Sequence, residues 1–442
     1  MKKFVSPYSP NTDSDRLEML KSIGVSSEKD LFADIPSKFV DPNLNLPSPR
    51  SELDLQSELY RLSKMNKTPG ETPSFLGAGS YRHFIPSAVK QIASRGEYMT
   101  AYTPYQPEVA QGTLQTGYEF QTMICELTGM EIANSGMYEG ASALAEAALM
   151  AVRINNRSEI IVLNSVSPLY IDVIKTFVEA PSINLITVNS IDELKSKISD
   201  NTSCVLVQNP NFFGYMENLD GISKICKNFN SLMVVSSNPI SMALFKPPGD
   251  YDADIVVAEG QSLGIPNSYG GPYVGIFTCK KKYIRQMPGR IVGRTIDNNN
   301  QKGFVLTLQT REQHIRREKA TSNICTSVAL IALTATAYLS ALGKTGIRHI
   351  AELCYHKAHY AASNIESIPG FSITMKGIFF NEFVVTCPIP PKKINSILLD
   401  KNIIGGYDIS NLVKNAMLIC VTELNSKDEI DKLVQVLSDI NI

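Results

Sequence analysis

The sequence lacks an excess of charge of either sign. Its 442 residues include 42 lysines and arginines against 43 aspartates and glutamates, so the formal net charge is −1. A chain so balanced has no bulk attraction for nucleic acid or for an anionic membrane surface. The N-terminal lysines are followed by no continuous apolar stretch, and no apolar run elsewhere approaches membrane-spanning length. We therefore expect no signal peptide, no membrane anchor, no membrane partner and no nucleic-acid partner.

The sequence also lacks cysteines and histidines at metal-binding or redox spacing. We expect reduced, mostly buried thiols, which indicates a cytoplasmic protein. His356 and His359 form a helical pair near His349, but no acid or cysteine is placed to complete a metal site around them. Packing or surface roles are expected for these histidines, and no metal site is predicted. The cysteines are Cys125, Cys204, Cys226, Cys279, Cys325, Cys354, Cys387 and Cys420.

What is present fits an ordinary globular protein with one large and one small domain, since 43% of residues are hydrophobic and 19% are charged. The large domain is expected at residues 66–330. Apolar, β-branched runs recur there between amphipathic helical stretches, which indicates a mainly parallel sheet covered on both faces. Residues 331–442 predict a small C-terminal α+β domain, with strands near 371–374 and 383–386 and a last helix from Lys427. The runs of the large domain are 160–163, 185–188, 205–207, 232–235, 255–257 and 273–277.

Residues 1–65 show helical patterning that is broken by stop signals. Apolar groups at helical spacing end before Gly24 and before Pro36. Short helices of this kind predict an N-terminal helical arm that lies over the body or over a partner. A longer apolar helix is expected at residues 326–342, ended by Gly343. Charged residues flank it closely, so we interpret it as a buried helix rather than a membrane segment.

A stiff, tyrosine-rich loop covers residues 101–113, with the sequence AYTPYQPEVAQGT. Its two prolines restrict the backbone, and such loops often carry function. The loop presents four polar side chains, those of Tyr102, Tyr105, Gln106 and Glu108. The alternative is a tyrosine-rich turn packed at a domain edge, and the loop alone does not decide between the two.

Residues 134–143, with the sequence NSGMYEGASA, form a small-residue loop that leads into an alanine-rich helix. The free backbone N–H groups and the positive dipole at such a helix N-terminus suit an anion. Small residues also serve the close packing of a helix on a sheet, and that alternative stays open.

Three long blocks of the sequence resemble one known family. They are YTPYQPEVAQGTLQTGYEFQTMICELTGMEIANSGMYEGASALAEAALMA from Tyr102, EGQSLGIP with SYGGPY from Glu259, and LQTREQHIRREKATSNIC from Leu308. With a shorter match in the arm, they resemble the glycine cleavage system P-protein over nearly the whole chain, specifically its first subunit in organisms that split the protein in two. The resemblance implies an α/β fold, that of pyridoxal-phosphate-dependent transferases of the aspartate aminotransferase type (fold type I).

Enzymes of that fold need two groups. An acid keeps the pyridine nitrogen protonated, and a lysine holds the aldehyde as an imine. By the resemblance the acid should follow the run 232–235, but this sequence continues SSNP. The lysine position falls near Ser262, and no lysine occurs between Lys246 and Lys280. We therefore expect a degenerate site that binds no cofactor covalently, and no catalytic residue on this chain.

The resemblance further implies a companion, P-protein subunit 2, that carries pyridoxal phosphate. The companion would form the imine with glycine, release carbon dioxide and pass the aminomethyl group to the lipoyl arm of the H-protein. The family suggests two copies of each subunit. This chain would then be a subunit of glycine dehydrogenase (aminomethyl-transferring) that is inactive alone and completes the companion's pocket.

Two segments are expected to reach that pocket. The first is the loop with Tyr102, Tyr105, Gln106 and Glu108, whose rigid polar groups would orient a small substrate or the lipoyl arm. The second lies where related folds reach across the dimer to the cofactor phosphate. A solvated basic helix start is an equal alternative for this second segment. Its candidates are Arg316, Arg317, Lys319, Thr321, Ser322 and Asn323.

Two other functions stay open. An autonomous pyridoxal enzyme that holds its cofactor without lysine predicts pyridoxal absorbance and turnover in the isolated chain. A pure docking scaffold for the lipoyl carrier predicts that Tyr105→Phe or Glu108→Gln changes the affinity for the carrier and leaves the glycine chemistry unchanged.

Overall fold

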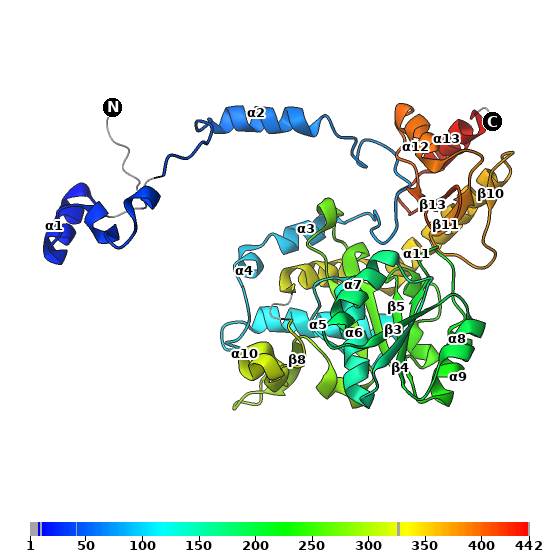
Figure 1. The fold of residues 1–442 in the computed structure, drawn as a ribbon, viewed down its shortest axis with the longest axis horizontal. Helices are drawn as coiled ribbons and strands as arrows, with labels where there is room; N and C mark the ends of the chain where they lie inside the picture. The colour runs from blue at the N-terminus through cyan, green and yellow to red at the C-terminus, as the bar shows by residue number, and fades with distance from the viewer. Residues whose placement is uncertain (1–7, 9–10, 41, 325–327, 441–442) are drawn as a thin grey trace. The chain divides into compact units, whose positions relative to one another are not determined.

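The computed structural model describes residues 8, 11–40, 42–324 and 328–440 (Figure 1). Cys325 and the start of the helix expected at 326–342 lie outside the described residues. The chain divides into two compact units, Met1–Lys67 and Thr68–Ile442, and each is described by itself.

The first unit is helical, as predicted. Its helix α1 (Asp13–Ile23) begins at Thr12, whose side chain accepts from the Asp15 N–H, and ends at Gly24 with φ 89°. The short helices η1 (Glu28–Phe32) and η2 (Ser37–Phe39) and the helix α2 (Glu52–Ser63) follow. No described residue of α1 or α2 is buried.

The second unit is built on a seven-stranded sheet with the order β1-β7-β6-β5-β4-β2-β3. The strands from β3 to β6 in this order are parallel, and β7 runs antiparallel to both β6 and β1. All six predicted runs are strands of this sheet, so the largely parallel sheet is confirmed, whereas the short β1 and the reversed direction of β7 were not predicted. The strands are β1 (Ile132–Ala133), β2 (Glu159–Leu163), β3 (Asn184–Val188), β4 (Thr202–Asn209), β5 (Leu232–Ser237), β6 (Ile255–Glu259) and β7 (Gly275–Cys279).

The strands are apolar on both faces because helices cover both. Ile160 and Val162 of β2 pack in one cluster with α6 and α7, while Ile161 and Leu163 pack in another with α8 and α9 (Figure 1). This alternation within one strand shows that each face has its own layer of helices. The helices are α6 (Gly140–Asn155), α7 (Pro168–Glu179), α8 (Ile191–Lys197) and α9 (Leu219–Asn228).

The helix α11 (Ala329–Glu366) packs against α3 and α5. Its one non-helical residue is Gly343, with φ 61° and ψ −178°, so two helical stretches meet there, as the sequence predicted. Among the described residues α11 alone is long and apolar enough to cross a membrane by length and composition, a test that core helices also pass. Its Ala335 and Tyr338 are fully buried in a cluster with α3 and α5, and 39% of its most apolar stretch is buried, so the buried-helix interpretation holds for part of the helix.

Further elements of this unit are α3 (Ser87–Ala93), α4 (Gly96–Met99), α5 (Gln111–Thr128), the hairpin β8 (Ile291–Ile296) and β9 (Lys302–Thr307), and α10 (Gln313–Arg316). A second, four-stranded antiparallel sheet has the order β10-β11-β13-β12, and α12 and α13 accompany it. This confirms the predicted small α+β fold. Phe75 joins its core from the segment before α3 and donates its N–H to the Ile404 carbonyl at 2.9 Å. The elements are β10 (Ser372–Ile373), β11 (Glu382–Thr386), α12 (Pro391–Asp400), β12 (Tyr407–Asp408), β13 (Ala416–Cys420) and α13 (Lys427–Ser438).

Candidate functional site

A small polar cavity lies at the carboxyl ends of β4, β5 and β6. In open α/β sheets ligands bind at this edge, so it is the place where the resemblance puts the cofactor. Its volume is about 40 Å³, which is room for about three water molecules. Its polar lining residues are Tyr81, Tyr170, Gln208, Asn211, Ser236, Ser237, Asn238, Glu259, Asn381 and Glu382.

The end of β5 offers hydroxyl and amide groups where the family pattern has an acid. Ser237 Oγ donates to the Asn209 carbonyl at 2.6 Å. Asn238 Oδ1 accepts from the Ile240 N–H at 2.9 Å, so this side chain organises its own turn. Both groups are therefore engaged in local structure.

The end of β6 turns into the short helix η5 (Gly260–Ser262). Gln261 accepts the Tyr81 N–H on Oε1 and donates from Nε2 to the Tyr81 carbonyl, both at 2.8 Å. Ser262, near the expected lysine position, is 2% exposed, and its hydroxyl has no hydrogen-bond partner among the described residues. The β6 end is therefore closed by packing and by an amide that binds backbone.

The N-terminus of α6 is occupied by two carboxylates of the chain itself. Glu139 accepts from the Ala141 N–H at 2.6 Å and the Ser142 N–H at 2.8 Å. Glu259, at the end of β6, accepts from the Gly140 N–H at 2.9 Å. The sequence predicted an anion seat here, and the structure shows that its first three N–H groups already bind Glu139 and Glu259.

Glu259 also accepts from the Gln261 N–H at 2.9 Å. Burial raises the pKa of Glu259 to about 8, and the charge of Glu139 raises it further. The hydrogen bonds that Glu259 accepts from backbone N–H groups act in the opposite direction. A second buried acid of the cavity, Glu382, accepts from Tyr81 Oη and from the Ala78 N–H, each at 2.6 Å. Burial raises the pKa of Glu382 to about 7. Both acids are therefore partly neutral near pH 7.

Tyr105 of the predicted loop meets the segment that follows β9. Arg290 Nη2 donates to Tyr105 Oη at 3.0 Å, and its guanidinium carbon lies 5.3 Å from the centre of the Tyr105 ring. Arg290 is 5% exposed, and its Nε lies 3.3 Å from Glu312 Oε2. The His314 ring lies 5.3 Å from that of Tyr105. The structure thus places Tyr105 beside Arg290, the residue before β8, and His314, which lies two residues before the second predicted segment.

Ser322 fastens the end of the second segment to α6. Its Oγ donates to Glu146 Oε1 at 2.8 Å. Glu146 is 2% exposed; burial raises its pKa, and the bond from Ser322 acts in the opposite direction. Helix α6 therefore binds Glu139 and Glu259 at its N-terminus and carries Glu146, the partner of Ser322, about two turns later.

The remaining predicted residues lie at the surface. Tyr102 is 77% exposed and Tyr105 is 47% exposed. Side chains that reach into a companion subunit need such exposure, but a solvated surface has it too, so their roles stay predictions. The others, all exposed except the half-buried Thr321, are Gln106, Glu108, Arg316, Arg317, Lys319, Thr321 and Asn323.

The family model of the glycine cleavage system P-protein matches residues 6–437. The chain belongs to the glycine cleavage system P-protein family. A curated P-protein relative, the probable glycine dehydrogenase (decarboxylating) subunit 1 of Thermomicrobium roseum, is 48% identical over 98% of this chain and 99% of its own length. The predicted family is therefore confirmed, and the chain is a subunit of glycine dehydrogenase (decarboxylating).

Solved structures confirm the predicted P-protein fold. A crystal structure of glycine decarboxylase (P-protein) of the glycine cleavage system, in inhibitor-bound form, has a TM-score of 0.92 at 39% identity and covers 98% of this chain and 100% of that one. A C-DES mutant with glycine covalently linked to its PLP cofactor has a TM-score of 0.63 at 12% identity, covering 85% of this chain and 99% of that one. At that identity the second match shows the fold alone.

Sequence reasoning missed several residues of this P-protein site. Glu139 and Glu259 both lie in blocks that resemble the family. The sequence did not show that they meet at one helix end, because the hydrogen bond from the Gly140 N–H to Glu259 joins residues 119 positions apart. Arg290 and Glu312 were also missed as partners of Tyr105. Arg290 directly precedes β8, and no sequence pattern marks its partner, which depends on the tertiary fold.

Proposed function

We propose that this P-protein chain is the accessory subunit of a glycine-decarboxylating complex and that its companion, subunit 2, carries pyridoxal phosphate. The observation that carries the proposal is the occupied N-terminus of α6, where Glu139 and Glu259 accept the N–H bonds that a phosphate would need. The charge of Glu139 at this position would also repel a phosphate dianion. An anion-bearing cofactor therefore has no free N–H groups of Gly140, Ala141 or Ser142 to bind at this helix end.

The other pocket residues do not fit pyridoxal phosphate either. An imine needs an amine, and Ser262 stands near the expected lysine position in a stretch without lysine between Lys246 and Lys280. The electron-sink chemistry of the cofactor needs an acid at its ring nitrogen, and β5 ends in Ser237 and Asn238. We infer that no cofactor is held covalently here and that no step of the chemistry uses this pocket.

The companion is supported by the relatives, which are first subunits of a divided enzyme. On this proposal subunit 2 binds the cofactor and glycine, and a lipoylated H-protein accepts the aminomethyl group after decarboxylation. The assembly has two copies of each subunit, as the family suggests.

The contribution of this chain is to complete the companion's pocket. Arg290 is buried and holds the Tyr105 hydroxyl, so the loop is braced from below while Tyr102 and Glu108 stay exposed. A braced loop presents its polar groups with little loss of side-chain entropy, which is what positioning a small substrate requires. The side chains of Gln106 in the loop and Asn323 in the second segment are exposed as well.

Trapping of the imine tests the proposal. The assembled complex is reduced with borohydride, digested, and searched by mass spectrometry for the peptide that carries the pyridoxyl group. The proposal expects it on a lysine of the companion and on no peptide of this chain. A pyridoxyl-lysine in this chain would show that the cofactor sits here, and would favour the autonomous enzyme.

A further inference from the structure

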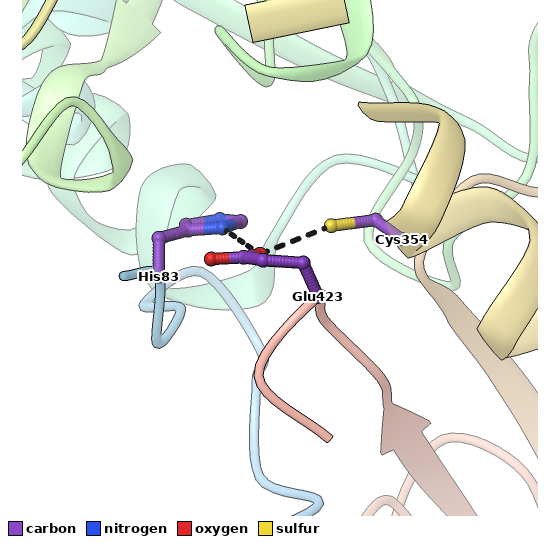
Figure 2. Close-up of side chains that lie close together, drawn as sticks. All are labelled: His83, Cys354 and Glu423. Carbon is purple, nitrogen blue, oxygen red and sulfur yellow. Dashed lines mark hydrogen bonds and ion pairs between the residues drawn. The ribbon is translucent and has the colours of Figure 1, made fainter. Parts of the chain in front are cut away.

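Three potential metal ligands meet in the core of the second unit, away from the residues considered above. His83 comes from the segment before α3, Cys354 from α11, and Glu423 from the segment between β13 and α13. Figure 2 shows the three side chains pointing toward one another, with both marked contacts ending on Glu423. Their sequence separations explain why cysteine and histidine spacing predicted no metal site.

The distances are close to those of a tetrahedral zinc site. His83 Nδ1 lies 2.7 Å from Glu423 Oε2, and Cys354 Sγ lies 3.4 Å from the same oxygen. All three ligand atoms lie within 4.8 Å of one another. Zinc bond lengths place such ligand atoms about 3.3 to 3.6 Å apart. Modest movements of the three side chains are therefore needed: the His83–Glu423 contact opens, and the ligand atoms of His83 and Cys354, which lie within 4.8 Å of each other, draw closer.

Burial and charge also suit a metal ion. The side chains of His83 and Glu423 are 2% and 8% exposed, and Cys354 is fully buried. Burial, with a further contribution from the charge of Glu423, raises the pKa of the Cys354 thiol well above its usual range, so the thiolate is costly without a cation. A divalent ion, one thiolate and one carboxylate form a neutral group, which a buried site tolerates.

The surrounding structure holds the ligands in place. Glu423 Oε1 accepts from the Phe84 N–H at 2.6 Å, which leaves Oε2 to face the other two ligands. Lys357 Nζ donates to the carbonyls of Glu423 and Asn425 at 2.6 and 2.7 Å and so fixes the turn that carries Glu423. His83 Nδ1 faces the Glu423 carboxylate, and His83 Nε2 has no hydrogen-bond partner among the described residues, so Nε2 can take the ring proton when Nδ1 binds a metal.

We propose that His83 Nδ1, Cys354 Sγ and Glu423 Oε2 bind one zinc ion. Binding releases the thiol proton of Cys354 to solvent, and the His83 proton moves from Nδ1 to Nε2. Three bonds to the metal form, one S–H bond and one N–H bond break, and one new N–H bond forms. The ion joins three segments that are distant in sequence, and its role is to stabilise their packing. This inference is independent of the proposed function.

The test uses the full chain, purified without an affinity tag and freed of metal with a chelator. Cobalt(II) serves as a spectroscopic probe, because thiolate ligation gives a charge-transfer band in the near ultraviolet. We expect the band to saturate at one equivalent, zinc to displace cobalt, zinc to raise the thermal midpoint, and binding to release one proton.

The variants isolate the ligands. Cys354→Ser should abolish the cobalt band and weaken zinc binding by at least about 100-fold, and Glu423→Gln should weaken it in the same direction. Cys387→Ser is the matched control, since Cys387 is another buried thiol, bonded to the Val385 carbonyl, and should leave the band unchanged. Circular dichroism verifies that each variant is folded. The absence of a saturable band in the wild-type chain, or an equal band in folded Cys354→Ser, would overturn the site.

Discussion

Glu259 is the residue that most directly closes the degenerate pocket. Its two oxygens accept from Gly140 and Gln261, and burial raises its pKa to about 8. Near pH 7 the carboxyl group is therefore mostly protonated, which relieves repulsion with Glu139. The buried carboxyl group occupies the N–H group of Gly140 as a covalent part of the chain, and its cost is a dependence of stability on pH.

Substituting Glu259 by Gln tests this cost. The pKa of Glu259 is higher in the folded state than its ordinary value of 4.5, so between those two values the folded state binds more protons than the unfolded state. The stabilisation is fully present below pH 4.5 and is lost as the pH rises through about 8. We expect the wild type to lose free energy of unfolding relative to Glu259→Gln between pH 5 and 8, as measured by urea unfolding. Exposed Glu366→Gln serves as control, and a pH-independent difference for Glu259→Gln would refute the buried, protonated acid.

Substituting Tyr105 distinguishes two hypotheses for this chain, a subunit that completes the companion's pocket and a docking scaffold for the lipoyl carrier. Tyr105→Phe removes the hydrogen bond from Arg290, a charged donor whose loss costs about 1.5 kcal/mol. If the loop completes the companion's pocket, glycine exchange by the complex should fall roughly tenfold, with unchanged affinity for the H-protein. Tyr407→Phe in β12 is the matched control, because Tyr407 is 46% exposed and Tyr105 is 47% exposed. Unchanged exchange with weakened carrier binding would support the scaffold instead.

At this scale the sequence named candidate residues, whose roles stay predictions, but it did not predict their contacts. The blocks around Tyr105, Ser262 and Ser322 were recognised from their residues. The bonds from Tyr105 to Arg290 and from Ser322 to Glu146 were not, because each joins residues far apart in the chain. Glu139 gave little signal as a helix cap, since serine, threonine, aspartate and asparagine are the usual residues there.

Helix α6 is the element on which the site depends. Its alanines, including Ala143 and Ala147, are fully buried on the sheet, so the small residues do serve close packing, the alternative that the sequence left open. Its N-terminus at the same time binds two carboxylates. The small-residue loop therefore packs closely on the sheet, and the N–H groups at its helix end bind two acidic side chains of the chain itself.

Gly140 tests the fit of this helix end. A Cβ added there would lie 2.6 Å from Tyr170 Oη and 2.9 Å from Glu259 Cβ. We expect Gly140→Ala to destabilise the chain by about 2 kcal/mol through overpacking, measured by chemical unfolding. Gly112→Ala is the matched control in helix α5, because nothing lies within 4 Å of its added Cβ. That control should be neutral or stabilising by up to about 1 kcal/mol, and an equal effect of both substitutions would show that α6 does not pack so closely.

The elements that the sequence predicted are those with a clear pattern. Buried runs such as 232–235 read as strands because both faces are covered. The two-residue strand β1 has no measurable period, and the hairpin of β8 and β9 is half exposed along much of its length. Strand β13, with the apolar run AMLIC, was available to sequence reasoning and was missed. The direction of β7 depends on the connections of the whole sheet, which a local pattern does not contain.

At the scale of the whole molecule, the chain has a P-protein fold with a small polar cavity at the carboxyl edge of its sheet. A TM-score of 0.92 to a glycine decarboxylase structure accompanies a pocket of about 40 Å³ at the sheet edge. The fold has thus been retained while the space for a ligand at this edge is small. On the proposed function, such a chain would serve the enzyme through its surface while its partner holds the cofactor.

The exchange of labelled carbon dioxide into glycine, with lipoylated H-protein present, tests this account most directly. The rate is measured for this chain alone, for the lysine-bearing companion alone, and for the two combined. The account predicts exchange in the mixture only, with the pyridoxal absorbance following the companion. Exchange or an imine absorbance in this chain alone would contradict it.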